Sequence, residues 1–122
     1  MEREIKFRAW DRNRLKMYQP AWSFFRSDQN TMAQEINAVG PYTFSVIMQY
    51  TGLKDKNGME IYEGDIIKDD WREEIGQIKF DEGCFACLLD GTIEHLAECA
   101  SDIEVIGNIY ENPELIDAAS DA

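Results

Sequence analysis

The sequence predicts a mostly β fold, either a small antiparallel sandwich or SH3-like, barrel-like sheets, with one or two short helices that include a C-terminal helical turn. One observation predicts the β class, and two more indicate a folded domain of ordinary size. Roughly six to nine short segments rich in β-branched and aromatic residues alternate with Gly, Asn and Asp turn signals. Hydrophobic residues make up 44% of the chain and aromatic residues 11%, which excludes a disordered protein. The 122 residues fit a single domain, 1–122, large enough to fold without a metal or a disulfide.

The N-terminal segment 4–19 predicts a β-hairpin with its turn at residues 11–14. Apolar and charged residues alternate along its first strand, so that the two kinds lie on opposite faces: Ile5, Phe7 and Ala9 on one, Lys6 and Arg8 on the other. Residues 20–40 are expected to be less regular. A helix-like spacing of apolar residues near the end of this stretch lacks the length and the cap of a stable helix.

Residues 42–110 are expected to form a β-rich core. Asp55–Gly58 is a strong turn signal, because Asn-Gly supplies two positions that tolerate positive φ. Residues 93–100 predict either a short helix or irregular structure. The strands of the core are expected at residues 42–51, 60–63, 65–68, 75–80, 84–89 and 103–110, with 81–83 as a hairpin turn.

A short helix and tail are expected at residues 112–122. Asn112 can cap a helix, Pro113 suits the first helical position, and Glu114 suits the positive end of the helix dipole. The remaining residues of the tail are small and acidic.

Charge restricts the classes of partner. The chain has 12 basic and 24 acidic residues, a net charge of −12, which disfavours nucleic acid and anionic membranes because the long-range field repels phosphate. Residues 1–26 are an exception, with a local excess of basic residues. They either form a basic strand pair that lies on the acidic body, or present a basic–aromatic contact patch for an anionic partner. The residues of that patch are Arg8, Trp10, Arg12 and Trp22.

A single histidine and three cysteines have a spacing that can be read as a zinc site: Cys84, Cys87, His95 and Cys99. Four such ligands suit tetrahedral zinc. However, the two cysteines that are three apart lie in a predicted strand, so their side chains point to opposite faces. Cysteines also pack as small hydrophobes. We therefore expect no metal and no cofactor, and we consider a Cys–His nucleophile even less favoured, because the sequence has no oxyanion-hole motif.

Paired carboxylates are frequent and can hold Mg²⁺ or act as acid and base. Here they occupy predicted turns and strand ends, where solvated charge is expected, and no basic partner follows at close range. We therefore expect no catalytic set among them. The carboxylates in question are Asp69, Asp70, Glu73, Glu74, Asp81, Glu82, Asp102 and Glu104.

The compartment follows from what the sequence lacks. No apolar run approaches the ~20 residues that span a bilayer, and the first residues contain no apolar core of a signal peptide. An odd number of cysteines without a secretion signal favours reduced thiols. The expected location is the cytoplasm.

Three segments resemble the YopX proteins of phages and prophages in bacteria. They are Ile5–Asp11, Met48–Ile67 and Glu104–Leu115, and they occur in the order and position that this family shows. The resemblance implies a mostly β fold and an origin in a mobile element within a bacterial host cell. It implies no activity and no site residues, because the function of the family is unknown.

The middle segment has a physical interpretation as strand–turn–strand architecture. Its glycines lie where turns need backbone freedom, and Gly64-Asp65 is typical of SH3-like barrels. The loop Lys54–Gly58 is an alternative contact site. The residues of this segment that we expect to be buried are Tyr50, Leu53, Ile61, Tyr62, Ile66 and Ile67.

The leading functional hypothesis is a non-enzymatic protein-interaction or assembly module that binds a host or phage protein. A homo-oligomer is a further expectation, because β edges readily pair. One alternative is an acidic decoy that occupies the nucleic-acid-binding site of a host protein. The other is a small carboxylate-based or zinc-dependent enzyme.

Overall fold

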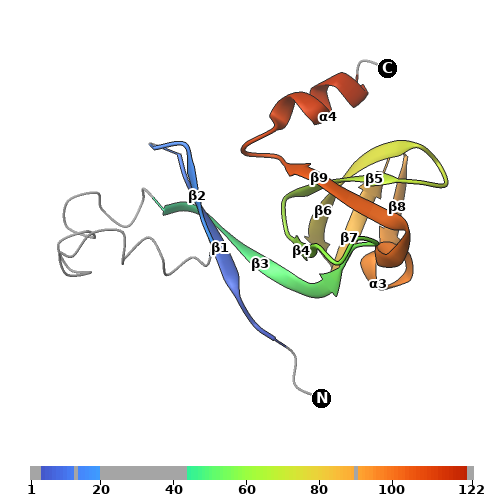
Figure 1. Ribbon diagram of the computed structural model, residues 1–122, viewed down its shortest axis with the longest axis horizontal. Coiled ribbons are helices and arrows are strands. Elements are labelled where there is room, and N and C mark those ends of the chain that lie inside the picture. The colour runs from blue at the N-terminus through green and yellow to red at the C-terminus, as the bar shows by residue number, and fades with distance from the viewer. Residues whose placement is uncertain (1–3, 13, 20–43, 90, 121–122) are drawn as a thin grey trace. The chain divides into compact units, whose positions relative to one another are not determined.

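The computed structural model describes residues 4–12, 14–19, 44–89 and 91–120 (Figure 1). The segment 20–40, expected to be less regular, lies outside these residues. The described elements are β1 (Phe7–Asp11), β2 (Lys16–Tyr18), β3 (Phe44–Lys54), β4 (Glu60–Tyr62), β5 (Asp65–Asp69), β6 (Glu74–Asp81), β7 (Cys84–Leu89), β8 (Thr92–His95), α3 (Leu96–Cys99), the 3₁₀ helix η1 (Ala100–Asp102), β9 (Ile103–Asn108) and α4 (Pro113–Ser120). The prediction of a mostly β fold with antiparallel sheets and a few short helices is confirmed.

The chain divides into two compact units, one containing Glu4–Gln49 and the other Tyr50–Ala122. Strand β3 belongs to both. Its first half pairs antiparallel with β1, and its second half pairs antiparallel with β4. The prediction of a single domain stays a prediction.

In the unit Glu4–Gln49, the predicted hairpin is present as β1 and β2, which pair antiparallel. Four successive residues of β1, from Arg8 to Asp11, are buried, so both faces of this strand are covered. The prediction of a basic–aromatic contact patch is therefore wrong for Arg8 and Trp10, which are both buried. Strand alternation predicts on which face of a strand a residue lies, but it does not predict whether that face is exposed to solvent. Arg12 is exposed, and Trp22 lies outside the described residues.

In the unit Tyr50–Ala122, five strands form an antiparallel sheet in the order β8-β7-β6-β5-β9. The predicted hairpin of β6 and β7 is confirmed. Its turn holds Glu82 at φ 47° and Gly83 at φ 84°, two successive positive values of the kind that tight hairpins use. The expectation for residues 93–100 needs correction, since Thr92–His95 form an edge strand on β7 and only Leu96–Cys99 are α-helical.

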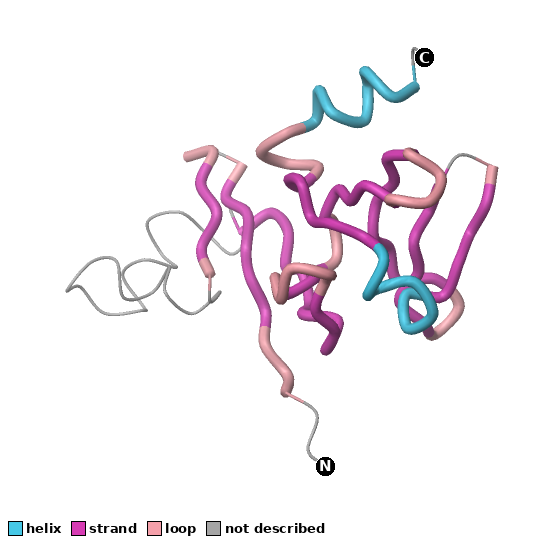
Figure 2. Tube along the Cα trace, turned by 45° about the vertical axis from the view of Figure 1, so that its right-hand side comes forward, coloured by secondary structure: helices cyan, strands magenta, loops and turns pink. Residues whose placement is uncertain are grey.

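The short helix α3 packs against β7 and β8 (Figure 2). The strand registers place the buried residues Ile67, Ile78, Cys87 and Leu89 on one face of the five-stranded sheet. Five of the six residues that we expected to be buried in the middle segment are buried, and Leu53 is half-buried. The buried cluster consists of Ile61, Ile67, Ile78, Cys87, Leu89, Leu96, Cys99, Ala100 and Ile103.

Helix α4 begins at Pro113, as predicted, and continues to Ser120. The side chain of Asn112 points back toward β9, where its Oδ1 accepts the N–H of Asn108 at 3.2 Å. The backbone carbonyl of Asn112 accepts the N–H of Leu115. Asn112 therefore fixes the connection from β9 into the helix. In the described part of the chain, no helix is both long and apolar enough to cross a membrane.

Candidate functional site

The turn Asp55–Gly58 is organised by one buried carboxylate. Asp55 is 6% exposed, and its Oδ1 accepts the backbone N–H groups of Asn57 at 2.8 Å and Met59 at 2.9 Å. Its Oδ2 accepts the N–H of Val105 in β9, also at 2.8 Å. One carboxylate thus closes the turn and fastens it to a strand fifty residues later.

Two more buried aspartates act in the same way. Asp65 Oδ2 accepts the N–H of Tyr62 at 2.7 Å. Asp69 Oδ1 accepts the N–H groups of Trp71 at 2.8 Å and Arg72 at 3.2 Å. Carboxylates that satisfy backbone donors in this manner stabilise turns. We conclude that Asp69, one of the carboxylates considered for catalysis, has a structural role in the connection between β5 and β6.

The loop Lys54–Gly58, considered as a contact site, lies beside the connection between β5 and β6. Lys56 donates a hydrogen bond from Nζ to Asp70 Oδ2 at 2.7 Å, which joins the two. This hydrogen bond raises the pKa of Lys56, so the ammonium group stays charged. Lys56, Asn57 and Gly58 are exposed.

The connection between β5 and β6 presents Trp71 to solvent. Its side chain is 84% exposed, the highest value among the large hydrophobic residues that the structure describes. The backbone around it is held by a hydrogen bond, in which Glu73, at a φ of 54°, donates its N–H to the carbonyl of Asp69 at 2.8 Å. The neighbouring Arg72 forms an ion pair with Glu94 on β8. A large aromatic side chain is therefore exposed on a turn that is held in place.

Sequence reasoning missed Trp71, since it treated residues 69–74 only as a turn rich in carboxylates. A signal was present in the sequence. A lone aromatic residue stands between Asp70 and Arg72, in a connection between two predicted strands. Apolar side chains in such connections have no adjacent strand face on which to be buried.

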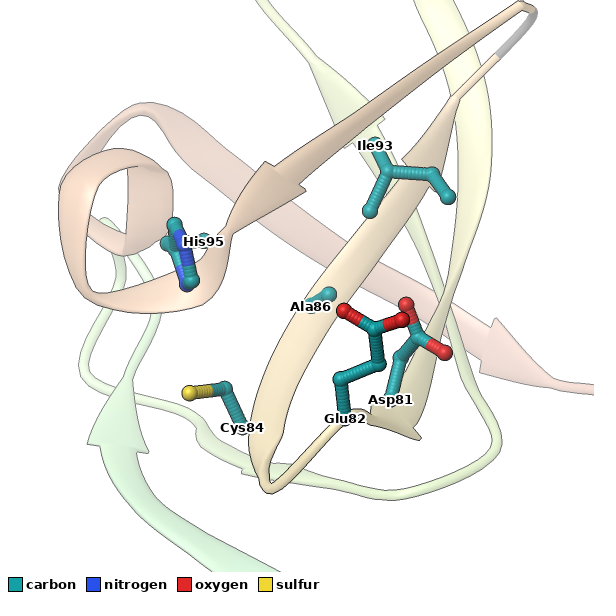
Figure 3. Close-up of a pocket in the computed structure, with 6 residues that line it drawn as sticks. All are labelled: Asp81, Glu82, Cys84, Ala86, Ile93 and His95. Carbon is teal, nitrogen blue, oxygen red and sulfur yellow. The ribbon is translucent and has the colours of Figure 1, made fainter.

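A surface pocket of about 190 Å³ opens beside the β6–β7 turn, lined by Asp81, Glu82, Cys84, Ala86, Ile93 and His95 (Figure 3). Ala86 pairs with His95 across β7 and β8, so Cys84, two residues earlier on β7, is a diagonal neighbour of His95 on the same face. Within the described residues, neither the Cys84 nor the His95 side chain forms a hydrogen bond. The hydrogen bond to a base that activates a nucleophile is thus not formed here.

The four residues of the possible zinc site are divided between two faces of the sheet. Cys84 and His95 are exposed in the surface pocket, whereas Cys87 and Cys99 are buried in the core. This division follows from strand alternation, because Cys84 and Cys87 are three residues apart on β7. Over residues 4–12, 14–19, 44–89 and 91–120, no group of three or more His, Cys, Asp or Glu side chains is placed to hold a metal ion.

Protein purified without chelator is expected to contain well under one zinc per chain, because a tetrahedral site needs its ligands on one side of the sheet. Elemental analysis of the purified protein by mass spectrometry measures this. A stoichiometric zinc content that disappears in the variant Cys84→Ser would contradict the division of the four residues.

The two buried cysteines lie in contact. Cys87 Sγ on β7 is 3.3 Å from Cys99 Sγ at the end of α3, and Cys99 Sγ also lies 3.6 Å from the carbonyl oxygen of His95. The hydrogen bond between the two sulfur atoms, together with burial, raises the pKa of the Cys87 thiol.

Comparison with known protein families matches residues 6–117 to the family described as YopX protein. No curated protein sequence matches the chain. Among solved structures, the crystal structure of protein EF1440 from Enterococcus faecalis is similar, with a TM-score of 0.63 and 28% sequence identity, covering 94% of this chain and 99% of that one. Because the family match extends over most of the 122 residues, the chain belongs to the YopX family.

Proposed function

We propose that this YopX protein is a non-enzymatic protein-interaction module, encoded by a phage or prophage, that binds a host or phage protein in the bacterial cytoplasm. The observation that carries the proposal is the exposure of Trp71 on a fixed turn. Tryptophan is enriched among the residues that dominate binding energy at protein interfaces. The surface formed by Trp71 and its neighbours Lys56, Asp70 and Arg72 is called the Trp71 surface below.

The rigidity of the turn supports this role. The N–H groups of Trp71 and Arg72 are held by Asp69, and the side chains of Asp70 and Arg72 are held by Lys56 and Glu94. A partner that covers the indole ring therefore has little backbone to order, and ordering is one of the main costs of association. The ion pairs around the ring also supply polar contacts for a rim.

Charge indicates the kind of partner. Residues 50–122 contain five basic and nineteen acidic residues, a net charge of −14. Electrostatic attraction therefore favours a partner with a basic surface, and the indole face can itself accept a lysine or arginine side chain. A second copy of the chain would bring like charges together at this turn. Homo-oligomers, if they form, are expected to use the edge strand β8 instead, because the turn Asp55–Gly58 already bonds to the outer edge of β9.

The variant Trp71→Ala is expected to lose its partner without losing its fold. Truncation of a central tryptophan typically costs about 2 kcal/mol or more of binding free energy, roughly a thirtyfold loss of affinity. The measurement is quantitative affinity purification with mass spectrometry from the bacterial cells that express the protein, followed by titration of the purified partner against both proteins.

Phe80→Ala is the matched control. Phe80 is also aromatic and exposed, but it lies near the opposite end of β6 from the Trp71 surface. It should retain the partner. The proposal fails if no protein is reproducibly enriched by the wild type, or if Trp71→Ala and Phe80→Ala retain the partner equally.

A further inference from the structure

The buried pair Cys87 and Cys99 has no role in the proposed interaction, and its geometry is specific. The two sulfur atoms are 3.3 Å apart, against about 2.05 Å in a disulfide. Cys87 is 0% exposed and Cys99 is 5% exposed. The residues lie on different elements, β7 and α3, which already pack against each other. Bond formation therefore requires the two sulfur atoms to approach each other by about 1.2 Å.

We propose that Cys87 and Cys99 are an oxidation site at which a hydroperoxide forms a reversible intramolecular disulfide between β7 and α3. The Cys99 thiolate attacks one peroxide oxygen, the O–O bond breaks, and the departing hydroxide takes up the thiol proton as water. Cys99 is then a sulfenic acid. The Cys87 sulfur attacks the Cys99 sulfur, the S–O bond breaks, and the second hydroxide leaves as water with the Cys87 proton. The two thiols lose two electrons in total, and one hydrogen peroxide becomes two waters.

The environment of the pair assigns the order of the two steps. Cys99 is 5% exposed and Cys87 is 0% exposed, so Cys99 lies closer to the solvent from which a small peroxide arrives. The hydrogen bond between the sulfur atoms lowers the pKa of Cys99, while that bond and burial raise the pKa of Cys87. Thiolates, not thiols, are the nucleophiles in this chemistry. Cys99 is therefore the attacking residue, and Cys87 resolves the sulfenic acid.

The third cysteine provides an internal comparison. Cys84 is exposed and lies on the same strand as Cys87, but its side chain projects into the surface pocket on the opposite face of the sheet (Figure 3). The sheet separates Cys84 from the buried pair. The proposal therefore predicts that the more accessible thiol is the one left out of the intramolecular disulfide.

The experiment treats the reduced, full-length protein with a few equivalents of hydrogen peroxide under native conditions. Remaining thiols are then alkylated in denaturant, and the protein is cleaved before aspartate residues. Cleavage of this type places Cys84 and Cys87 in the fragment 81–89 and Cys99 in the fragment 90–101. The expected product is a linked pair of these fragments, about 2 Da lighter than their sum, that carries one alkyl group and separates on treatment with dithiothreitol.

Matched variants assign the bond. Cys84→Ser should form the linked pair as the wild type does, whereas Cys87→Ala and Cys99→Ala should not. A second readout is thermal stability. The cross-link restricts the unfolded chain, so oxidised wild type and oxidised Cys84→Ser are expected to show a Tm roughly 5 °C or more above their reduced forms. Reduction should reverse the shift.

Two outcomes overturn the proposal. In the first, Cys87 and Cys99 both remain open to alkylation after Cys84 has been oxidised. In the second, a linked pair forms in the wild type but disappears in Cys84→Ser, which would show that Cys84 supplies one of the sulfur atoms.

Discussion

Replacing Asp55 with alanine is expected to lower the free energy of unfolding by about 2–4 kcal/mol. The variant removes the acceptor of three backbone N–H groups, those of Asn57, Met59 and Val105. A buried donor left without a partner costs roughly 1–3 kcal/mol, and the donors in the exposed part of the turn recover some of this from water. Chemical denaturation with urea measures the change, as a lower midpoint at an unchanged slope.

Two further variants separate the role of Asp55 from a general effect of charge. Asp70→Ala removes an aspartate whose ion pair with Lys56 is partly exposed, and it should cost under about 1 kcal/mol. Asp55→Asn keeps one acceptor oxygen but places an NH₂ group against an N–H donor. Its loss of unfolding free energy should therefore lie between those of Asp70→Ala and Asp55→Ala. If Asp55→Ala were no more destabilising than Asp70→Ala, the hydrogen bonds of Asp55 would not be what holds the turn to β9.

The role of Asp55 indicates that the segment most typical of the YopX family has a structural role. Segment Met48–Ile67 is the most recognisable part of the chain, and its residues are used for structure. Thr51 donates from its hydroxyl to the carbonyl of Ile61 at 2.7 Å, Asp55 closes the turn, and Asp65 holds the N–H of Tyr62. The proposed contact residue Trp71 lies just outside this segment. The signature identifies the fold, and the Trp71 surface is built upon it.

The strands of the core were predictable because their signals are local. Segments 65–68, 75–80 and 84–89 differ from β5, β6 and β7 by one residue at most at either end. Their β-branched and aromatic residues, separated by Gly-containing turns, specify both strand and connection without reference to the rest of the chain.

Strand β8 was not predictable in the same way. Thr92–His95 contains one large apolar residue, Ile93, and that side chain is exposed. The segment is a strand because it pairs with the edge of β7, which is a contact made by folding and not a property of the segment. The same limit applies to Arg8, whose burial depends on what covers β1.

The candidate sites depend on long-range contacts even more strongly. Cysteine spacing suggested one set of four ligands, but strand alternation separates Cys84 from Cys87, and α3 then returns Cys99 to the buried face. The pairing of Cys87 with Cys99 therefore depends on how the short helix α3 packs against β7, and no local sequence pattern specifies that packing. The sequence shows a tryptophan at position 71, but it does not show the turn that exposes this side chain, which Asp69 holds through its hydrogen bonds to the N–H groups of Trp71 and Arg72.

Replacing Gly76 with alanine is expected to cost about 3 kcal/mol of unfolding free energy. Gly76 lies in β6 opposite Ile67 of β5. A Cβ atom at this position would lie 2.6 Å from the carbonyl oxygen of Leu88 and 2.8 Å from Leu89 Cδ2. The oxygen belongs to the backbone of β7, so relief requires β6 and β7 to move apart. Overpacking of this kind typically costs 1–3 kcal/mol, and the upper end applies because the clash is with backbone.

Gly83→Ala in the turn of the same hairpin is the matched control, because it adds the same methyl group for a different physical reason. Its φ of 84° disfavours a side chain, but a Cβ there meets nothing within 4 Å. The cost should be about 1–2 kcal/mol from backbone strain alone. Urea denaturation of both variants distinguishes the two mechanisms. Gly76→Ala should also weaken protection of the β6–β7 amide groups from hydrogen exchange, whereas Gly83→Ala should change exchange only near the turn. Equal costs with equal exchange patterns would mean that the close approach of β6 to β7 does not require glycine.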